Sequence, residues 1–376
     1  MRDTIGSFTR FDESGFPGGD TVQSDAIAVF LSQHGYQIRR IGFPWPRHPG
    51  VDLAVVFNLT RPIEAYLQAR YAVSANIPYI VFPVYWDLDS LEMNGTFIDT
   101  IKTLLPRPVK NWVRLRKFKT RYPSMQMEQG LERDPNLGHQ RRMIQYVLEH
   151  AAFVCPNSVA EREHLDECYS LANTSTKVIY NGFYPVDHRG QASAPPDPHT
   201  QLPPDYLCCV GAIGPRKNQL NLVRAANETG LHVVIVGGTA PEAERYARVV
   251  RESAGSTVHF LGRQPQDMVM GIMARSRGHV QPSYIETPGL ASLEAASMGC
   301  PIAVSDVAPV REYFQQHALY CQPASVDSIA QVLLNLQHQP IPDMDLIAHV
   351  HTHFSWDNVL LPLLEVLQEV DRQCRR

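Results

Sequence analysis

Residues 281–301 read Gln-Pro-Ser-Tyr-Ile-Glu-Thr-Pro-Gly-Leu-Ala-Ser-Leu-Glu-Ala-Ala-Ser-Met-Gly-Cys-Pro. A short apolar run ends just before this stretch, and another begins at its last residue. Between the two runs, Thr287 supplies an N-cap hydroxyl and Pro288 an early-turn proline, residues 290–298 are good helix formers, and Gly299 is a natural stop. The pattern predicts a unit of strand, turn, helix and strand.

Two carboxylates of this stretch can face the same end of the unit. Glu286 lies in the turn, and Glu294 lies about two turns inside the helix at roughly 3.6 residues per turn. The free N–H groups of Gly289 and Leu290 form the positive end of the helix, which binds anions. A sugar attached to a diphosphate would satisfy these groups together. For either acid taken alone, stabilisation of the helix dipole or simple solvation is the plainer explanation.

This Glu-x7-Glu spacing, with Pro-Gly-Leu inside it, resembles the donor-sugar motif of retaining GT-B glycosyltransferases of the GT4 type. The resemblance extends over nearly the whole chain. It implies an α/β protein of the GT-B class, with two Rossmann-like domains, parallel sheets and an interdomain cleft. Within the motif it implies that the donor is bound by Glu286, Thr287, Pro288, Gly289, Leu290 and Glu294.

The resemblance also implies an activity. We expect a retaining, metal-independent hexosyltransferase that moves a hexose from a nucleotide-diphosphate sugar, with a UDP-sugar favoured, to a hydroxyl of a saccharide or lipid-linked saccharide. Such a reaction belongs to polysaccharide or glycoconjugate synthesis. Glu286 would orient the sugar, and no cofactor is expected because the nucleotide sugar is a substrate.

The composition predicts a folded protein of two domains. A chain of 376 residues is long enough for two domains of ordinary size, and 44% hydrophobic residues support real cores. The formal net charge of -4 argues against general binding to nucleic acid. Seven cysteines without a Cys-x-x-Cys pair are typical of reduced thiols. With no apolar run near the ~18 residues of a membrane span, we expect a cytoplasmic protein, at most peripheral at the inner membrane surface.

Short apolar runs alternate with amphipathic stretches through the first half of the chain, which predicts parallel strands joined by right-handed crossovers. Residues 186–205 are rich in proline and poor in large apolar side chains, as in an extended linker. We therefore expect an acceptor domain at 1–185 and a donor domain at 206–355. The final stretch, 356–376, is expected to be a helix that returns to the first domain.

Candidate groups of the first domain lie after its strands. Gly18 and Gly19 open a helix, and the resemblance places them near the donor diphosphate, although a plain turn explains them equally well. Many relatives carry a histidine where this chain has Tyr85, Trp86 and Asp87. Asp87 is the candidate for the group that activates the acceptor, and a buried aromatic pair with a helix-capping aspartate is the alternative.

Residues 102–122 contain many lysines and arginines, no acidic residue, and aromatic or leucine side chains at spacings of three or four. Such a segment could lie on an anionic membrane surface or hold a lipid-diphosphate acceptor. A basic loop that covers the acceptor site is the alternative.

The first strand of the second domain leads into a segment that resembles the family's Gly-Arg-x-x-Pro-x-Lys-Asn, in which both cations hold the diphosphate. Lys217 matches the lysine, whereas Ala212 stands where the arginine is expected. Either the neighbouring Arg216 replaces it, or phosphate binding loses a charged hydrogen bond worth roughly 1.5 to 3 kcal/mol. The resemblance places the nucleotide base near Gly262 and Arg263, at the end of another strand.

Other functions stay open at this point. The missing arginine and histidine suggest a non-catalytic nucleotide-sugar binding or scaffold protein of the same fold. A GT-B relative that epimerises or phosphorolyses sugars is a third hypothesis. The histidines of residues 349–353 would line up in an extended chain, but their flanks read as helix and no acid or cysteine is suitably spaced, so we expect no metal site.

Overall fold

The computed structural model describes residues 3–11, 18–86, 107–121, 134–185, 202–287 and 289–374. These residues form two compact units. The first unit holds the described residues of the amino-terminal half up to 180 together with 360–374, and the second holds 181–359. Within the described residues, no helix is both long enough and apolar enough to cross a bilayer.

The described part of the first unit is built on a five-stranded parallel sheet with the strand order β2-β1-β3-β4-β5. Two of its central strands read Leu-Ala-Val-Val-Phe and Tyr-Ile-Val-Phe and are almost completely buried, as expected for strands covered on both faces. The strands are β1 (Thr4–Phe8), β2 (Gln37–Ile41), β3 (Leu53–Phe57), β4 (Tyr79–Phe82) and β5 (Phe153–Val154).

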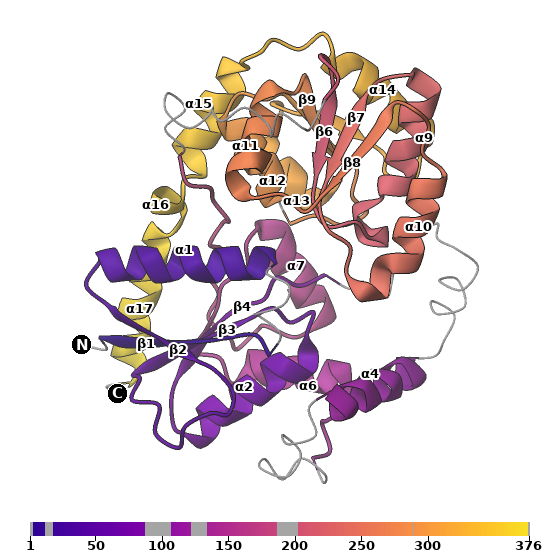
Figure 1. The fold of residues 1–376 in the computed structure, drawn as a ribbon. Helices are drawn as coiled ribbons and strands as arrows, with labels where there is room; N and C mark the ends of the chain where they lie inside the picture. The colour runs from indigo at the N-terminus through magenta and orange to yellow at the C-terminus, as the bar shows by residue number, and fades with distance from the viewer. Residues whose placement is uncertain are drawn as a thin grey trace. The chain divides into compact units, whose positions relative to one another are not determined.

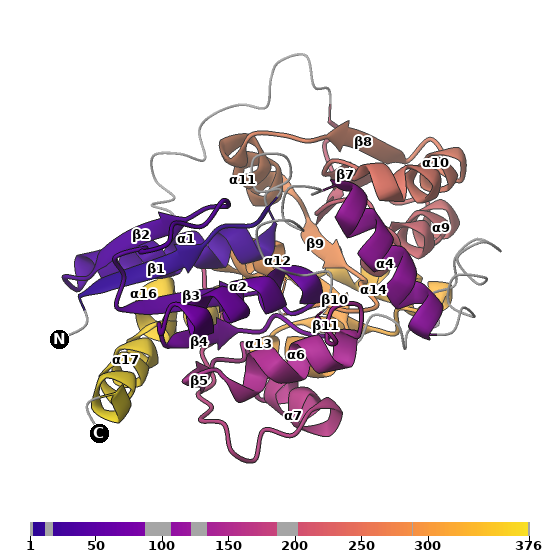
Figure 2. The same ribbon diagram turned by 90° about the horizontal axis from the view of Figure 1, so that it is seen from below.

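Helices cover both faces of this sheet. Figure 1 shows α1 on one side and α2 and α6 on the other, and Figure 2 shows α2 and α6 side by side. Apolar side chains of α2 and α6 pack on the strands in one buried core. The helices are α1 (Gly19–Gln33), α2 (Pro62–Ser74), α4 (Arg107–Arg121), α6 (Gln140–Glu149), α7 (Val159–Cys168) and α17 (Leu361–Cys374).

The described part of the second unit is built on a six-stranded parallel sheet with the order β11-β10-β9-β6-β7-β8. The chain runs outward from β6 to β8, then crosses back to β9 beside β6 and runs outward in the other direction. Its strands are β6 (Leu207–Val210), β7 (Val233–Val236), β8 (Val258–Gly262), β9 (Gly278–Gln281), β10 (Ile302–Ser305) and β11 (Leu319–Cys321).

In Figure 1, α9 and α14 lie on one side of the second sheet and α11 and α12 on the other. The helical elements are η3 (Pro215–Lys217), α9 (Gln219–Thr229), η4 (Pro241–Ala243), α10 (Glu244–Glu252), α11 (Gln266–Arg275), α12 (Leu290–Ser297), α13 (Ala308–Phe314), α14 (Val326–Leu336), α15 (Met344–His353) and α16 (Trp356–Val359). The predicted α/β class with two Rossmann-like parallel sheets is confirmed.

Candidate functional site

Two loops at the carboxyl edge of the second sheet form the candidate site. One follows β6 and contains η3, and the other follows β9 and contains Glu286. β6 and β9 are neighbours in the sheet, and the strand order reverses between them. Open parallel sheets bind ligands at such a reversal, outside the carboxyl ends of the strands.

Hydrogen bonds join the two loops. The backbone N–H of Tyr284 donates to the carbonyl of Arg216 at 2.9 Å, and Nδ2 of Asn218 donates to the carbonyl of Pro282 at 2.9 Å. Asn218 has a φ of +59°, in the left-handed region that asparagine tolerates better than most residues. This turn starts α9 directly after Lys217, so the lysine stays at the sheet edge.

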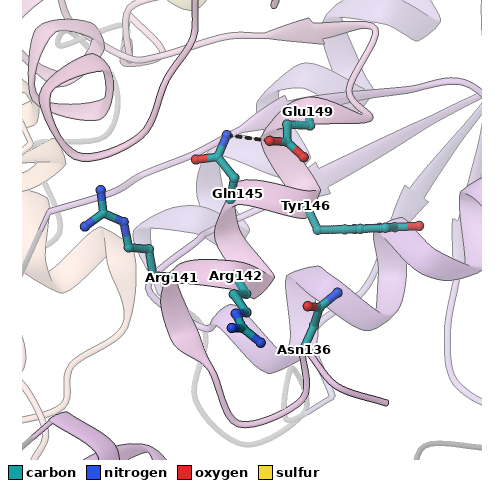
Figure 3. Close-up of a pocket in the computed structure, with 6 residues that line it drawn as sticks. All are labelled: Asn136, Arg141, Arg142, Gln145, Tyr146 and Glu149. Atoms are coloured by element: carbon teal, nitrogen blue, oxygen red, sulfur yellow. Dashed lines mark hydrogen bonds between the residues drawn. The ribbon is translucent and has the colours of Figure 1, made fainter.

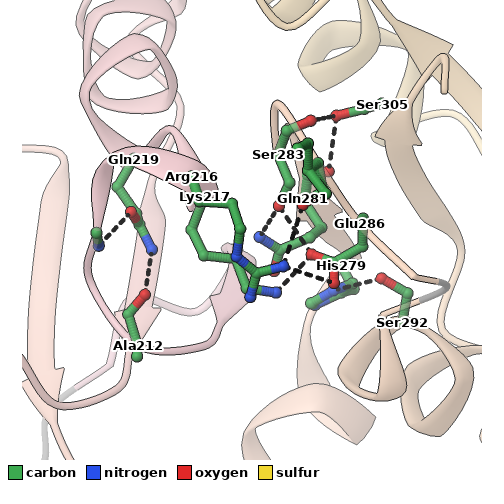
Figure 4. A network of polar contacts seen from close by, with 12 residues as sticks. Ala212, Arg216, Lys217, Gln219, His279, Gln281, Ser283, Glu286, Ser292 and Ser305 are labelled. Carbon is green, nitrogen blue, oxygen red and sulfur yellow. Dashed lines mark hydrogen bonds and ion pairs between the residues drawn. The ribbon is translucent and has the colours of Figure 1, made fainter. Parts of the chain in front are cut away.

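Lys217 and Glu286 form an ion pair at the centre of the site (Figure 4). Nζ of Lys217 lies 2.5 Å from Oε2 of Glu286, and Nη1 of Arg216 lies 3.8 Å from Oε1. Glu286 is only 7% exposed. Because water is largely excluded, the charges interact more strongly than they would at the surface.

Position 212 is an alanine where an arginine is expected, and the nearby Arg216 brings a guanidinium to the site instead. Ala212 contributes only its carbonyl, which accepts a hydrogen bond from Nε2 of Gln219 at 3.1 Å. Nη1 of Arg216 donates to the carbonyl of Ile285 at 3.2 Å, which holds the guanidinium beside Glu286. The structure therefore brings two cations of η3 to one carboxylate.

Both members of the central pair have shifted pKa values. Burial acts to raise the pKa of Glu286, but the charges of Lys217 and Arg216 and the hydrogen bonds from Lys217 and Ser283 outweigh it and lower this pKa to about 2. Burial lowers the pKa of Lys217 although Glu286 opposes this effect. The carboxylate is therefore ionised at neutral pH and can accept hydrogen bonds.

Gly289 caps the amino end of α12 with a φ of +88°, without a side-chain hydrogen bond. The expectation of Thr287 as the N-cap is wrong, because the N-cap lies two residues later, at Gly289, and the helix begins at Leu290. A Cβ on Gly289 would lie 3.1 Å from Cγ of Glu286, so glycine suits this position both in conformation and in space. The first amides of α12 consequently start next to the acidic side chain. Pro288 lies outside the described residues.

Glu294 lies further along α12 and is partly buried. Nε2 of Gln266 donates to its Oε1 at 3.1 Å. Burial raises the pKa of Glu294 to about 7, and the hydrogen bond from Gln266 opposes that shift. This carboxyl group therefore titrates near neutral pH, unlike Glu286.

The predicted base-binding residues lie at the end of β8. Gly262 has a φ of +65°, and its carbonyl accepts from the N–H of Gly237 at 2.8 Å. Arg263 is exposed, and its Cβ lies close to Gly238. Both residues therefore belong to the carboxyl edge of the second sheet.

Gly18 and Gly19 belong to the first unit, at the amino end of α1. The strand order of the first sheet also reverses nearby, between β1 and β3. In the first turn of α1, the buried Asp20 pairs with Arg10 at 2.9 Å and accepts from Nδ2 of Asn58 at 2.7 Å. A Cβ on Gly18 would lie 2.7 Å from Oδ1 of Asp20, so a larger residue at position 18 would crowd this carboxylate.

Asp87 lies outside the described residues, whereas the two aromatic residues before it are described. The hydroxyl of Tyr85 lies 3.0 Å from that of Tyr169, and the ring of Trp86 stacks on His164 with 4.8 Å between centroids. Sequence reasoning missed His164 because it comes from α7 and not from the end of β4.

Glu161 is a second residue that sequence reasoning missed. Its buried carboxylate accepts from the backbone N–H of Tyr85 at 2.5 Å and from that of Asn157 at 2.6 Å. Burial raises the pKa of Glu161 to about 7 against these two hydrogen bonds. The spacing Ser158-x-x-Glu161 is a capping-box signal that could have identified it.

A cavity of about 360 Å³ runs along α6 (Figure 3). Two arginines lie on it, and one of them, Arg141, donates from Nη2 to the carbonyl of Cys168 at 3.1 Å. Nε2 of Gln145 donates to Oε1 of Glu149 at 2.9 Å. Arg141 and Gln145 therefore hydrogen-bond to other groups of the first unit. None of the described site residues predicted from the sequence lines this cavity.

The histidines of residues 349–353 lie on α15, a helix, and not on an extended segment. Nε2 of His349 lies 2.7 Å from the carbonyl of Tyr313, and Nε2 of His351 lies 3.0 Å from that of Ser297. In the part of the chain that the structure describes, no three His, Cys, Asp or Glu side chains are grouped as metal ligands.

Comparison with known proteins finds a family match within the second unit. Residues 195–349 match the family Glycosyl transferases group 1. The chain is 29% identical over 163 residues to O-antigen chain mannosyltransferase B of Escherichia coli, covering 41% of this chain and 43% of that protein. It is 27% identical over 247 residues to D-inositol 3-phosphate glycosyltransferase of Mycolicibacterium paratuberculosis, covering 61% and 55%. The chain thus spans about half the length of these curated relatives.

Solved structures are similar over the whole chain. Sucrose-phosphate synthase from Thermosynechococcus elongatus aligns with a TM-score of 0.72 at 17% identity, over 99% of this chain and 100% of that one. Anabaena HepE in complex with UDP and glucose aligns with a TM-score of 0.67 at 16% identity, over 97% and 99%. Identities this low show the fold alone. Together with the strand orders, they identify the chain as a GT-B-fold protein, and its residues 195–349 match the glycosyl transferases group 1 family.

Proposed function

We propose that this protein is a retaining glycosyltransferase that moves a hexose from a nucleotide-diphosphate sugar to a hydroxyl of a saccharide or lipid-linked saccharide. The observation that carries the proposal is the convergence of Lys217 and Arg216 on Glu286, next to the amino end of α12. A UDP-hexose is our favoured donor, since a solved structure of the similar HepE is a complex with UDP and glucose. Polysaccharide or glycoconjugate synthesis is the process we assign to it.

The chemistry follows from where charge develops. As the diphosphate leaves, negative charge grows on its oxygen and positive charge on the anomeric carbon of the sugar. Lys217, Arg216 and the amides at Gly289 and Leu290 are preorganised to stabilise the leaving group. Because these groups supply positive charge, we propose that transfer needs neither a metal ion nor another cofactor.

The acids have separate roles in this proposal. Glu286 accepts hydrogen bonds from the sugar hydroxyls and orients the anomeric carbon, and Glu294 binds the ribose diol. In the structure Lys217 is paired with Glu286. Donor binding must therefore exchange partners, so that the lysine turns to the diphosphate and the carboxylate to the sugar. The acceptor then attacks from the face that the diphosphate leaves, which retains configuration.

Transfer can be tested with purified protein, a panel of UDP-, GDP- and ADP-hexoses, and a mixture of saccharide acceptors analysed by mass spectrometry. We expect product from a UDP-hexose, with an anomeric configuration by NMR that matches the donor. Lys217→Met should lower kcat by about 100-fold or more, since removal of one preorganised donor typically costs that much. Arg248→Ala, at an exposed position on α10, is the control. Equal rates in both variants would refute the role of Lys217.

A non-catalytic nucleotide-sugar binding protein is the second candidate, favoured by Ala212 at the position of the expected arginine. It predicts that a UDP-hexose binds tightly while no labelled sugar reaches any acceptor. Product from the transfer assay excludes it.

We further propose that α4 brings the protein to an anionic membrane surface on the cytoplasmic side, where lipid-linked acceptors are available. Leu115 and Phe118 pack against the core of the first unit, while Trp112 is 58% exposed with the guanidinium of Arg116 5.3 Å from its ring. The helix contains no acidic residue. Basic helices with exposed aromatic side chains bind anionic lipid surfaces.

Sedimentation with vesicles tests this contact. We expect the protein to sediment with phosphatidylglycerol vesicles at low salt and not with phosphatidylcholine vesicles. Trp112→Ala with Arg116→Ala should weaken binding several-fold, whereas Thr120→Ala, also exposed on α4, should not. Unchanged binding of the double variant would exclude α4 as the contact.

A further inference from the structure

Three buried polar side chains lie behind Glu286, across the carboxyl ends of β9 and β10 (Figure 4). They are Gln281, Ser283 and Ser305, with exposures of 1%, 0% and 0%. Polar groups are rarely buried this completely unless hydrogen bonds hold them. None of the three is a group we expect to touch the donor.

The hydrogen bonds between them have a defined direction. Nε2 of Gln281 donates to Oγ of Ser283 at 2.9 Å, and Oγ of Ser283 donates to Oε2 of Glu286 at 2.9 Å. A serine hydroxyl has a single proton. Because the amide of Gln281 donates to this oxygen, the proton of Ser283 is directed to the carboxylate.

The backbone of the loop is held from both sides. Oγ of Ser305 donates to the carbonyl of Ser283, and Nδ2 of Asn218 donates to the carbonyl of Pro282 at 2.9 Å. The hydroxyl of Ser283 therefore stays at a fixed place relative to β9. A rigid second layer of this kind is what keeps a functional group in its productive orientation.

We propose that Ser283 is a positioning residue for Glu286, with Gln281 setting the direction of its proton. The inference rests on the proposed function. In the structure, Oε2 of Glu286 is shared between Lys217 and Ser283. Once the diphosphate draws Lys217 away, Ser283 keeps Oε2 in place and leaves Oε1 to the sugar.

A titration that does not depend on activity tests the first part. The experiment starts from the Lys217→Met variant, in which Glu286 lacks its lysine partner, as we propose it does when the donor is bound. The labelled carboxyl carbon of Glu286 is followed by ¹³C NMR as the pH is changed. Its signal is assigned by its absence after Glu286→Gln. Adding Ser283→Ala should move the titration to higher pH, because a hydrogen bond to the ionised form is lost.

Ser276→Ala is the matched control. It also removes a buried serine hydroxyl of the second unit, one that donates to the carbonyl of Met273 at 2.8 Å. Ser276 lies before the start of β9, whereas Glu286 follows its end. It should leave the Glu286 titration unchanged. If Ser283→Ala leaves the titration where it was, the positioning role is wrong.

Kinetics test the second part in the otherwise wild-type chain. Ser283→Ala should lower kcat by about tenfold or more while the KM for the donor changes much less, because orientation and not affinity is lost. Gln281→Met should have a smaller effect in the same direction, since the hydroxyl of Ser283 can then rotate. A loss confined to KM would overturn the proposal.

The two arms separate the inference from the function on which it rests. If the titration moves as expected but the wild-type protein transfers no sugar, Ser283 still positions Glu286 and the transferase assignment fails. If sugar is transferred but neither the titration nor kcat responds to Ser283→Ala, the positioning role fails and the transferase assignment stands.

Discussion

Glu286 and Glu294 are eight positions apart on one stretch, yet they meet different surroundings. Two cations and a serine hydroxyl surround Glu286. Glu294 accepts a hydrogen bond from a single amide, and burial has the largest effect on its pKa. Their pKa values consequently move in opposite directions, to about 2 and about 7. The same residue type therefore supplies one carboxylate that is charged at neutral pH and one that titrates near neutrality.

The titration of Glu294 predicts pH-dependent donor binding. An ionised carboxylate accepts hydrogen bonds from the ribose diol better than a neutral carboxyl group. The affinity for a UDP-hexose should therefore rise several-fold between about pH 6 and about pH 8, as Glu294 loses its proton. Calorimetric titration across this range measures the effect.

Glu294→Gln should bind more weakly and lose most of this pH dependence. Glu252→Gln, at an exposed position at the end of α10, should keep it. A slope that survives in Glu294→Gln would assign the dependence to another group.

Glu161 predicts an effect of pH on stability. Its pKa is raised from 4.5 to about 7 in the folded chain, so between these values the folded state binds more protons than the unfolded state. The free energy of unfolding should therefore fall as pH rises through this window, by up to about 3 kcal/mol. Urea unfolding of the wild-type protein at several pH values measures the slope.

Glu161→Gln should remove the part of that slope that comes from Glu161. Glu294 titrates in the same window, so Glu294→Gln is the comparison that shows how much belongs to each acid. Identical slopes in the wild-type protein and Glu161→Gln would contradict the assignment.

The helix α12 shows how one element serves both fold and site. Its start at Gly289, with a left-handed backbone, turns the chain so that the first amides begin next to Glu286. A threonine cap at position 287 would have required the helix to start earlier. Gly289 therefore determines where α12 begins, and so which backbone amides lie next to Glu286.

Substitution of Gly289 separates these contributions. Gly289→Ala should cost about 1–2 kcal/mol, since alanine is disfavoured in the left-handed region. Gly230→Ala has the same backbone cost, with a φ of +69° and open space around the glycine. Thermal unfolding should show similar losses for both variants, while only Gly289→Ala should also lose donor affinity. Equal donor affinities of the two variants would show that an added Cβ next to Glu286 does not disturb donor binding.

Each unit of the molecule has its own buried core, one on the five-stranded sheet and one on the six-stranded sheet among the described residues. The predicted donor groups with the strongest mutual contacts, Lys217, Arg216 and Glu286, all belong to the second unit. Donor binding should consequently stabilise that unit most directly.

A UDP-hexose at 100 times its dissociation constant should add roughly 2.7 kcal/mol to the stability of the binding-competent state. Hydrogen exchange should show added protection at the loops after β6 and β9 and at the start of α12. Glu294→Ala should abolish the thermal shift at the same ligand concentration. Equal shifts in wild-type protein and Glu294→Ala would refute the assignment of that residue to the ribose.

Local patterns in the sequence were sufficient for the class of fold and for one stretch of the site. The alternation of apolar runs with amphipathic stretches predicted parallel sheets, because such strands must be covered by helices on both faces. In residues 281–301, the strand, the helix and the stop at Gly299 were predicted correctly, and only the cap was misplaced. These are properties of neighbouring residues, and short-range periodicity encodes them.

The tertiary structure alone decided which distant groups meet. Lys217 and Glu286 are 69 positions apart, and Tyr85 and Glu161 are 76 apart. Whether such groups touch depends on strand order, since β6 and β9 become neighbours only when the chain crosses back past β8. A hydrophobic pattern shows that a strand is buried but does not specify its neighbour, so the pairing of the lysine with the acid, the approach of Arg216 and the buried row behind Glu286 became visible only in the folded chain.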